Sequence, residues 1–330
     1  MDPTLPPLSA SLAGTGRPTA GARIAGLGAY RPGTVVSNEE AAAAAEVDAD
    51  WIAQRVGVRE RRYATPAESV VSMAVEAGSK ALADARATAA DVDVVILATC
   101  SMPSPMPNGA ASVAAGIGCR PAAGFDVNAA CSGFCHGLAV ADALVRTGVA
   151  GGVLVVGSER MSDWVDAQDR NTGPIFADGA AAALVLPSEQ PAIFPVAWGS
   201  DGDQAALIAI SPVSGHMEMT GRKVFRWTTS ALPSVIDEAC QRAGIAPADL
   251  KGFVPHQANL RIINSLAEHI GAAGIVTATD VTDAGNTCGA SVPLAFHALR
   301  QSGRVHSGDP VLLFGFGAGL TYAAQVVLCP

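Results

Sequence analysis

Short apolar runs, separated by segments of helical periodicity, constrain the fold of this sequence more than any other feature. The first half holds three such runs of strand length, in DVDVVILATCS, GFDVNAA and GGVLVVGSE. Runs of this kind suit strands that are buried on both faces. Between them lie segments such as VSMAVEAGSKALADA, whose apolar residues recur at helical spacing. The alternation predicts an α/β fold in which helices cover the sheets in layers.

The second half repeats this scheme. We expect strands in AIFPVAWGS, GFVPHQ and GIVTATD, helices in ANLRIINSLAEHIG and NTCGASVPLAFHALRQSG, and a hairpin with a Gly-rich turn in PVLLFGFGAGLTYAAQVVL. The segment KVFRWTTSALPSVIDEACQRAG reads as one helix that is kinked or broken at Pro233. Two halves of similar length and element order predict a duplicated α/β unit, with a boundary near Gln190. We therefore expect a mobile N-terminal tail (1–21), an N-terminal half (22–190) and a C-terminal half (191–330).

Composition narrows the class of protein. With 330 residues, 49% of them hydrophobic and 15% charged, the chain can bury a large core. Apolar runs stay below the about 18 residues of a membrane span, and the N-terminus lacks the basic start and apolar stretch of a secretion signal. The net charge of -9 gives no support to nucleic-acid binding. We expect a cytoplasmic protein without a membrane or nucleic-acid partner.

Cysteine usage directs attention to one position. Seven cysteines without regular spacing indicate reduced thiols and not a disulfide framework. Cys131 follows a short strand and precedes a helix, where free N-H groups and the helix dipole favour a thiolate. The alternative is a buried core cysteine. Cys135 and His136 resemble part of a haem-attachment run, but the spacing of the cysteines is wrong, so we expect no haem and no metal.

A histidine and an asparagine occupy similar junctions. His256 ends the strand in FVPHQANLRI, and Asn286 precedes a helix in DAGNTCGASVPLAF. Taken singly, His256 reads as a satisfied polar residue and Asn286 as a helix N-cap. Together with Cys131 they form a set suited to nucleophilic catalysis on a thioester, because α/β sites gather at the carboxyl ends of strands.

The chain contains four motifs in the order AACSGF, VPHQANLRI, GNTCGASVP and FGFGAGLTYA. In order and spacing they resemble the β-ketoacyl-acyl carrier protein synthase III family of the thiolase superfamily, over almost all of residues 22–329. The likeness is greatest to actinobacterial members, including those that prime aromatic polyketide synthases. The resemblance implies a thiolase-like fold with αβαβα layers and a homodimer.

The resemblance also implies roles for individual residues. Cys131 would be the acylated nucleophile, with His256 and Asn286 completing the triad, and the backbone N-H groups of Cys131 and Ala318 would form the oxyanion hole. Met106, from a loop that crosses the dimer interface, would floor the partner's acyl pocket. Coenzyme A would contact Trp51, Arg170, Phe225 and Asn259, and the carrier protein would contact Arg222, Arg226 and Arg261.

The implied reaction is a decarboxylative Claisen condensation of acyl-Cys131 with malonyl-acyl carrier protein, with acyl-CoA as a substrate and no cofactor. Two alternatives remain open: an acyltransferase that passes the acyl group to an alcohol, an amine or a carrier protein, and a non-catalytic subunit that binds a carrier protein. Two stretches depart from the family pattern. Cys288 and Gly289 stand in GNTCGAS, and Gly173, Pro174 and Ala177 stand in NTGPIFADGA, near the expected substrate pocket.

Overall fold

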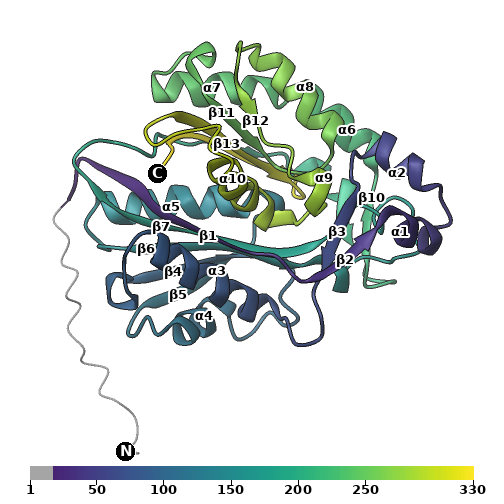
Figure 1. Cartoon of the computed structure of the whole chain (residues 1–330), viewed down its shortest axis with the longest axis horizontal. Coiled ribbons are helices and arrows are strands. Elements are labelled where there is room, and N and C mark those ends of the chain that lie inside the picture. Colours follow the sequence, from purple (N-terminus) through teal and green to yellow (C-terminus); the bar gives the residue numbers. More distant parts are fainter. Residues whose placement is uncertain (1–17) are drawn as a thin grey trace, which may run out of the picture.

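A computed structural model describes residues 18–330 of the chain, so most of the predicted tail (1–21) lies outside the described residues. Two five-stranded mixed sheets form its framework (Figure 1). The first sheet has the order β1 (Gly21–Tyr30), β7 (Asp178–Ser188), β6 (Val153–Arg160), β4 (Val94–Ala98), β5 (Ala123–Val127). The second has the order β8 (Ala197–Ser200), β14 (Thr321–Leu328), β13 (Pro310–Gly317), β11 (Gly252–Pro255), β12 (Val276–Thr277).

The two sheets share one pattern of strand directions. In the first sheet β1, β7 and β6 pair antiparallel, and β6, β4 and β5 pair parallel. In the second sheet β8, β14 and β13 pair antiparallel, and β13, β11 and β12 pair parallel. The predicted duplication of an α/β unit is therefore confirmed. The division into domains near Gln190 stays a prediction.

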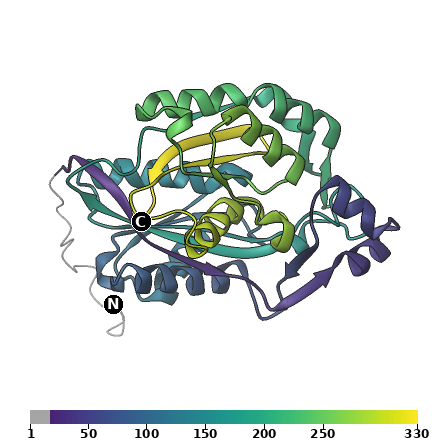
Figure 2. The ribbon, with the colours of Figure 1, turned by 45° about the horizontal axis from the view of Figure 1, so that its top comes forward.

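Helices fill three layers around the sheets (Figures 1 and 2). Helices α3 (Val70–Asp84) and α4 (Gly109–Ile117) pack on the outer face of the first sheet. Helices α5 (Gly133–Arg146) and α10 (Ser291–Gln301) lie between the sheets and form the central core with strands of both. Helices α7 (Pro233–Ala243) and α8 (Leu260–Ile270) cover the second sheet. The αβαβα layering of the thiolase-like fold is confirmed.

Smaller elements border one end of these layers. They are α1 (Asn38–Ala45), α2 (Ala49–Arg55), the antiparallel pair β2 (Thr34–Ser37) and β3 (Glu60–Tyr63), the antiparallel pair β9 (Ile208–Ile210) and β10 (Met217–Met219), α6 (Gly221–Ser230) and α9 (Val281–Ala284). Helices α1 and α2 are separate because the Asp48 carboxylate accepts the N-H of Asp50 and caps α2.

Several predicted elements differ in extent. At Pro233 the break, one of the two predicted alternatives, is confirmed: α6 ends at Ser230, and Pro233 occupies the first turn of α7, where its missing N-H costs no hydrogen bond. In AIFPVAWGS only the last four residues pair as a strand. Strand β5 is not buried on both faces, because it is the edge of its sheet and Phe125 is 37% exposed. Within residues 18–330, none of the helices combines the length and apolarity that a membrane crossing requires.

Candidate active site

Cys131 lies in a 3-10 turn, Ala130–Ser132, that leads directly into α5. The turn brings Cys131 to the end of the inner helix layer, where its side chain is 8% exposed. Ala130 has a φ of 45°, a conformation that non-glycine residues adopt at a cost and that clusters at functional sites. Opposite lies Gly317, where a Cβ atom would stand 2.9 Å from the Cys131 sulfur. Only glycine lets the β13–β14 turn approach the thiol this closely.

His256 follows β11 and is 2% exposed. Its Nδ1 lies 2.6 Å from the Ser291 hydroxyl, and its ring meets the Phe316 ring edge-on at 5.3 Å. The Ser291 oxygen also accepts the N-H of Gln257, so its proton is free to be donated to Nδ1. When the hydroxyl donates to Nδ1, the imidazole hydrogen is on Nε2, and that nitrogen is then the donor.

Asn286 is held by backbone and side chain together. Its N-H donates to the Ile175 carbonyl and its own carbonyl accepts the N-H of Ala177, which forms a β-bridge with Phe176. Its Oδ1 accepts the N-H of Cys288 at 2.9 Å. With Oδ1 engaged, the Nδ2 group is the donor that this side chain offers to a ligand.

An inner cavity of about 210 Å³ joins these residues. Cys131, His256, Asn286 and Ala318 all line it, so the structure brings together the predicted triad and the predicted oxyanion turn. The rest of the lining is mostly apolar. It includes Met161, Trp164, Phe176, Ile208, Met217, Trp227 and Leu320. Such a lining suits an acyl chain and strengthens electrostatic interactions at the thiol.

Three thiols meet at this cavity. The Cys288 sulfur lies 3.3 Å from that of Cys131 and 3.4 Å from that of Cys100. The hydrogen bond from Cys288 is the main reason that the pKa of Cys131 falls well below its ordinary value; burial opposes it, and the nearby His256 lowers the pKa further. The pKa of Cys288 rises well above its usual range, because its thiol hydrogen bonds to both neighbours and is buried. Of the three thiols, Cys131 is therefore the one whose surroundings favour the thiolate.

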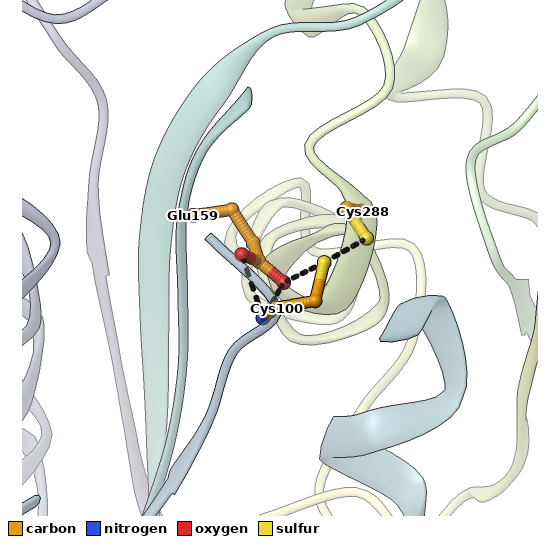
Figure 3. A group of neighbouring side chains, drawn as sticks. All are labelled: Cys100, Glu159 and Cys288. Atoms are coloured by element: carbon orange, nitrogen blue, oxygen red, sulfur yellow. Dashed lines mark hydrogen bonds between the residues drawn. The ribbon is translucent and has the colours of Figure 1, made fainter. Parts of the chain in front are cut away.

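Glu159, at the end of β6, binds the segment that carries Cys100 (Figure 3). Its carboxylate accepts the N-H groups of Cys100 and Gly289, both at 3.2 Å, and the hydroxyls of Thr99 and Ser101. Burial nevertheless raises the pKa of Glu159 to about 7. The Cys288 hydrogen bond lowers the pKa of Cys100, but burial and the Glu159 charge outweigh it and raise that pKa to about 11.

The ligand atoms of Cys100, Glu159 and Cys288 lie within 4.8 Å of one another, as in some metal sites. The Glu159 oxygens already accept four groups of the protein, so a metal would have to displace them. This cluster therefore suits a structural and thiol role better than metal binding.

An outer cavity of about 650 Å³ shares Phe176, Asn286 and Ile262 with the inner one. All four residues predicted for coenzyme A line it: Trp51, Arg170, Phe225 and Asn259. The Arg170 guanidinium stacks 5.2 Å from the Trp51 ring centroid. The Asn259 side chain also caps α8 by accepting the N-H of Arg261, and donates to the Arg55 carbonyl.

The residues predicted to contact the carrier protein do not all lie at the same place. Arg222 and Arg261 line the outer cavity, and Arg261 lies 5.2 Å over the Phe225 ring. Arg226 is exposed on α6 and is not a lining residue of either cavity. Met106 is 80% exposed on the loop between β4 and α4 and does not line the inner cavity of its own chain.

The residues that depart from the family pattern also differ in whether they lie at a cavity. Cys288 lines the inner cavity. Gly289 lets the Glu159 carboxylate come close, because a Cβ atom there would stand 2.8 Å from it. Gly173, Pro174 and Ala177 are not among the cavity-lining residues, contrary to expectation. The carbonyl of Pro174 instead accepts a hydrogen bond from the buried Arg61, so this loop has a supporting role.

Sequence reasoning missed Ser291, Cys100 and Glu159. Ser291 is the last residue of the GNTCGAS motif and the first residue of α10, and its place in that motif was the available signal. Cys100 follows β4, and Glu159 lies near the end of β6. The sequence does not show that these two strands are neighbours in the sheet.

Comparison with known proteins agrees with this geometry. Residues 125–202 match the family described as 3-oxoacyl-[acyl-carrier-protein (ACP)] synthase III, and residues 240–329 match its C-terminal part. The chain is 46% identical to a β-ketoacyl-[acyl-carrier-protein] synthase III of Streptomyces coelicolor, over 94% of this chain and 99% of that protein. Among solved structures, the priming β-ketosynthase of the R1128 polyketide pathway superimposes with a TM-score of 0.92 at 40% identity, covering 95% of this chain and 98% of that one. A synthase III of Pseudomonas aeruginosa gives 0.89 at 35% identity, with coverages of 94% and 98%.

Proposed function

This chain belongs to the 3-oxoacyl-[acyl-carrier-protein] synthase III family, and from that premise we propose that it condenses an acyl group from acyl-CoA with malonyl-acyl carrier protein. The product is a β-ketoacyl-carrier protein, which initiates fatty-acid or aromatic polyketide synthesis. One observation carries the proposal: Cys131, His256 and Asn286 line a single apolar cavity, and the surroundings of Cys131 favour its thiolate.

The first half-reaction loads the enzyme. The Cys131 thiolate attacks the acyl-CoA thioester, and the backbone N-H groups of Cys131 and Ala318 stabilise the oxyanion. Each such donor contributes about 3 kcal/mol in comparable sites. Coenzyme A leaves as its thiol, and the acyl chain remains in the inner cavity.

The second half-reaction makes the carbon-carbon bond. His256 Nε2-H and Asn286 Nδ2-H donate to the thioester oxygen of malonyl-carrier protein, so that loss of carbon dioxide gives a stabilised enolate. The enolate carbon attacks the acyl-Cys131 carbonyl and releases the thiolate. The contact between His256 and Ser291 supports the donor role of Nε2. The reaction requires no cofactor and no metal.

The outer cavity supports the binding of both carriers. We propose that an adenine enters between Trp51 and Arg170, which must separate to admit it, and that Phe225 and Asn259 border the same path. We assign Arg222, Arg226 and Arg261 to the acidic carrier protein, because a chain of net charge -9 needs a local basic surface to meet it.

We further propose a homodimer formed through β5. This edge strand has β4 as its one neighbour and exposes Phe125, so its free side can pair with a second copy. The Asn108 side chain donates to the Gly124 carbonyl and thus attaches the Met106 loop to this edge. A floor for the partner's acyl pocket made by Met106 depends on this arrangement. Seven free thiols support a cytoplasmic location.

Product analysis tests the proposed reaction. Purified protein is incubated with an acyl-CoA panel and then with malonyl-carrier protein, and the carrier is analysed by intact mass. A β-ketoacyl product supports condensation. Transfer of the acyl group without loss of carbon dioxide would indicate the acyltransferase, and absence of acyl-Cys131 would indicate a non-catalytic subunit.

A further inference from the structure

Two thiols beside the nucleophile take no covalent part in the proposed reaction. Cys288 stands between Cys131 and Cys100, with sulfur-sulfur distances of 3.3 and 3.4 Å (Figure 3 shows the Cys288 and Cys100 side). A disulfide needs about 2.05 Å, so either contact closes with a small side-chain movement. Cys288 is buried and Cys100 is half-buried, and both belong to the lining of the inner cavity.

The position of Cys288 is strongly determined. Its backbone has a φ of 45°, an uncommon conformation for a residue with a side chain, and its N-H is held by Asn286. Cys100 is held in turn by Glu159, whose carboxylate accepts its N-H and lies 3.5 Å from its sulfur. Two separate segments of the chain are thus fixed so that the Cys288 sulfur contacts the sulfurs of both Cys100 and Cys131.

We propose that Cys288 and Cys100 form a resolving pair that returns Cys131 to its reduced form after oxidation by a hydroperoxide. The inference rests on Cys131 being the reactive thiolate of the proposed function. Without a resolving thiol, a sulfenic acid at Cys131 would proceed to the irreversible sulfinic acid.

The chemistry has three steps. The Cys131 thiolate attacks the hydroperoxide, the oxygen-oxygen bond breaks, and Cys131 sulfenic acid and an alkoxide or hydroxide form. The Cys288 thiol then displaces hydroxide from the Cys131 sulfur, which gives a Cys131-Cys288 disulfide and water. Finally Cys100 attacks the Cys288 sulfur, its proton passes to Glu159, and the Cys131 thiolate leaves. In total two thiols are oxidised to the Cys100-Cys288 disulfide, and the peroxide is reduced by two electrons.

The direction of the last step follows from the surroundings of the thiols. In thiol-disulfide exchange the thiol of lower pKa is the better leaving group. Once Cys288 is in the disulfide it no longer donates a hydrogen bond to Cys131, but His256 still lowers the pKa of Cys131, whereas burial and the Glu159 charge raise that of Cys100. Glu159 lies close enough to the Cys100 sulfur to take its proton as the new bond forms.

Disulfide mapping after a limited peroxide treatment tests the relay. Wild type, Cys288→Ser, Cys100→Ser and, as a matched buried control, Cys240→Ser are treated with one equivalent of hydrogen peroxide, quenched with an alkylating agent and digested. Acylation of Cys131 by acyl-CoA is measured before treatment, after it, and after dithiothreitol, each relative to the untreated variant. Cys240 packs in the separate core around α7 and α8.

We expect wild type and Cys240→Ser to carry the Cys100-Cys288 disulfide and to keep most of their acylation. Cys100→Ser should stop at the Cys131-Cys288 disulfide, lose acylation and regain it with dithiothreitol. Cys288→Ser should gain one oxygen atom on Cys131 from the first equivalent, as a sulfenic acid, and a second oxygen atom from a further equivalent, which gives the sulfinic acid and leaves the variant inactive after dithiothreitol. In wild type quenched at successive times, the Cys131-Cys288 disulfide should precede the Cys100-Cys288 disulfide.

Full recovery by dithiothreitol of Cys288→Ser that has received two equivalents of peroxide, or wild type that carries no disulfide at Cys288 after one equivalent, would overturn the relay. Failure of the untreated protein to acylate on Cys131 would count against the proposed function instead, because the disulfide map does not depend on acyl-CoA.

Discussion

Helices α5 and α10 begin alike, yet they present different atoms to the same cavity. Each follows a 3-10 turn whose first residue has a φ of 45°, Ala130 in the first half and Cys288 in the second. In the first half the next residue is Cys131. In the second half the next residue is Gly289, and polar chemistry comes from Asn286 just before the turn.

The strands before these helices extend the comparison. Strand β4 is followed by Cys100, and its counterpart β11 by His256, so each half contributes two junctions to one site. Duplication supplied one framework twice, and the residues at its junctions then diverged. In the proposed reaction the first half supplies the nucleophile, and the second half supplies the donors that act on it and on the malonyl group.

Loss of the nucleophile should have the largest effect. Cys131→Ala should lower condensation by at least about a thousandfold, because no other group supplies the covalent step. Intact mass after incubation with acyl-CoA measures the adduct directly. An adduct of wild-type stability on Cys135 or Cys288 in this variant would contradict the assignment. Cys135 is a good internal control, since burial raises its pKa to about 12.

Substitutions in the C-terminal half should affect the two half-reactions to different degrees. His256→Ala and Asn286→Ala should lower malonyl decarboxylation by about a hundredfold, the usual cost of one lost donor to a developing oxyanion. Self-acylation should fall less, because the oxyanion of that step is bound by backbone N-H groups. Single-turnover acylation and carbon dioxide release are measured separately. Equal losses in both steps would remove the proposed division between the halves.

The effect of the second half on the thiolate can be measured by pH. A lowered pKa keeps Cys131 ionised as the pH falls, so its alkylation by iodoacetamide should persist at pH 6, where an ordinary thiol is under about 1% thiolate. Removal of the Cys288 donor in Cys288→Ala should shift the profile to higher pH. The rate at pH 6 should then fall about tenfold, as expected for one hydrogen bond to a charged group. An unmoved profile would show that Cys288 does not stabilise the thiolate.

The sequence predicted the residues at the junctions of strands and helices better than it predicted the contacts between these junctions. Cys131, His256 and Asn286 follow from local patterns, because a strand, a turn and a helix can be read from neighbouring residues. The Cys131-Cys288-Cys100 contacts join segments distant in the chain, and only the crossing of both sheets brings them together. Likewise β9 and β10, which add Ile208 and Met217 to the inner cavity, are three residues each and too short for a periodicity signal.

Two of the arginines that line the outer cavity, Arg261 and Arg170, offer a smaller contrast between the halves. Arg261→Glu, in the second half, should raise KM for malonyl-carrier protein by roughly fivefold, as expected for loss of about 1 kcal/mol of ion pairing. Arg170→Ala, in the first half, should raise KM for acyl-CoA instead. Added salt should shrink the Arg261 effect, because exposed charges are screened. Equal damage by Arg261→Glu to both substrates would show that this side chain also serves coenzyme A.

The smallest expected effect concerns the chain length of the starter acyl group. It is tested by comparing Met106 of the first half with Met217 of the second. Met217 is 9% exposed and lines the inner cavity of its own chain, whereas Met106 can reach an acyl pocket only across the proposed dimer. The cavity of about 210 Å³ far exceeds the ~10–15 Å³ that one water needs, so starters longer than acetyl should fit.

Phenylalanine at either position should narrow the pocket and shift preference toward the shortest acyl-CoAs. Each methylene excluded should cost roughly 1 kcal/mol, or several-fold in kcat/KM. The values of kcat/KM for acetyl-, butyryl- and hexanoyl-CoA are compared in wild type, Met106→Phe and Met217→Phe. A shift with both substitutions is expected if the partner's loop completes the pocket. A shift with Met217→Phe and an unchanged ratio with Met106→Phe would instead mean that each chain closes its own pocket, with Met106 serving only the contact between subunits.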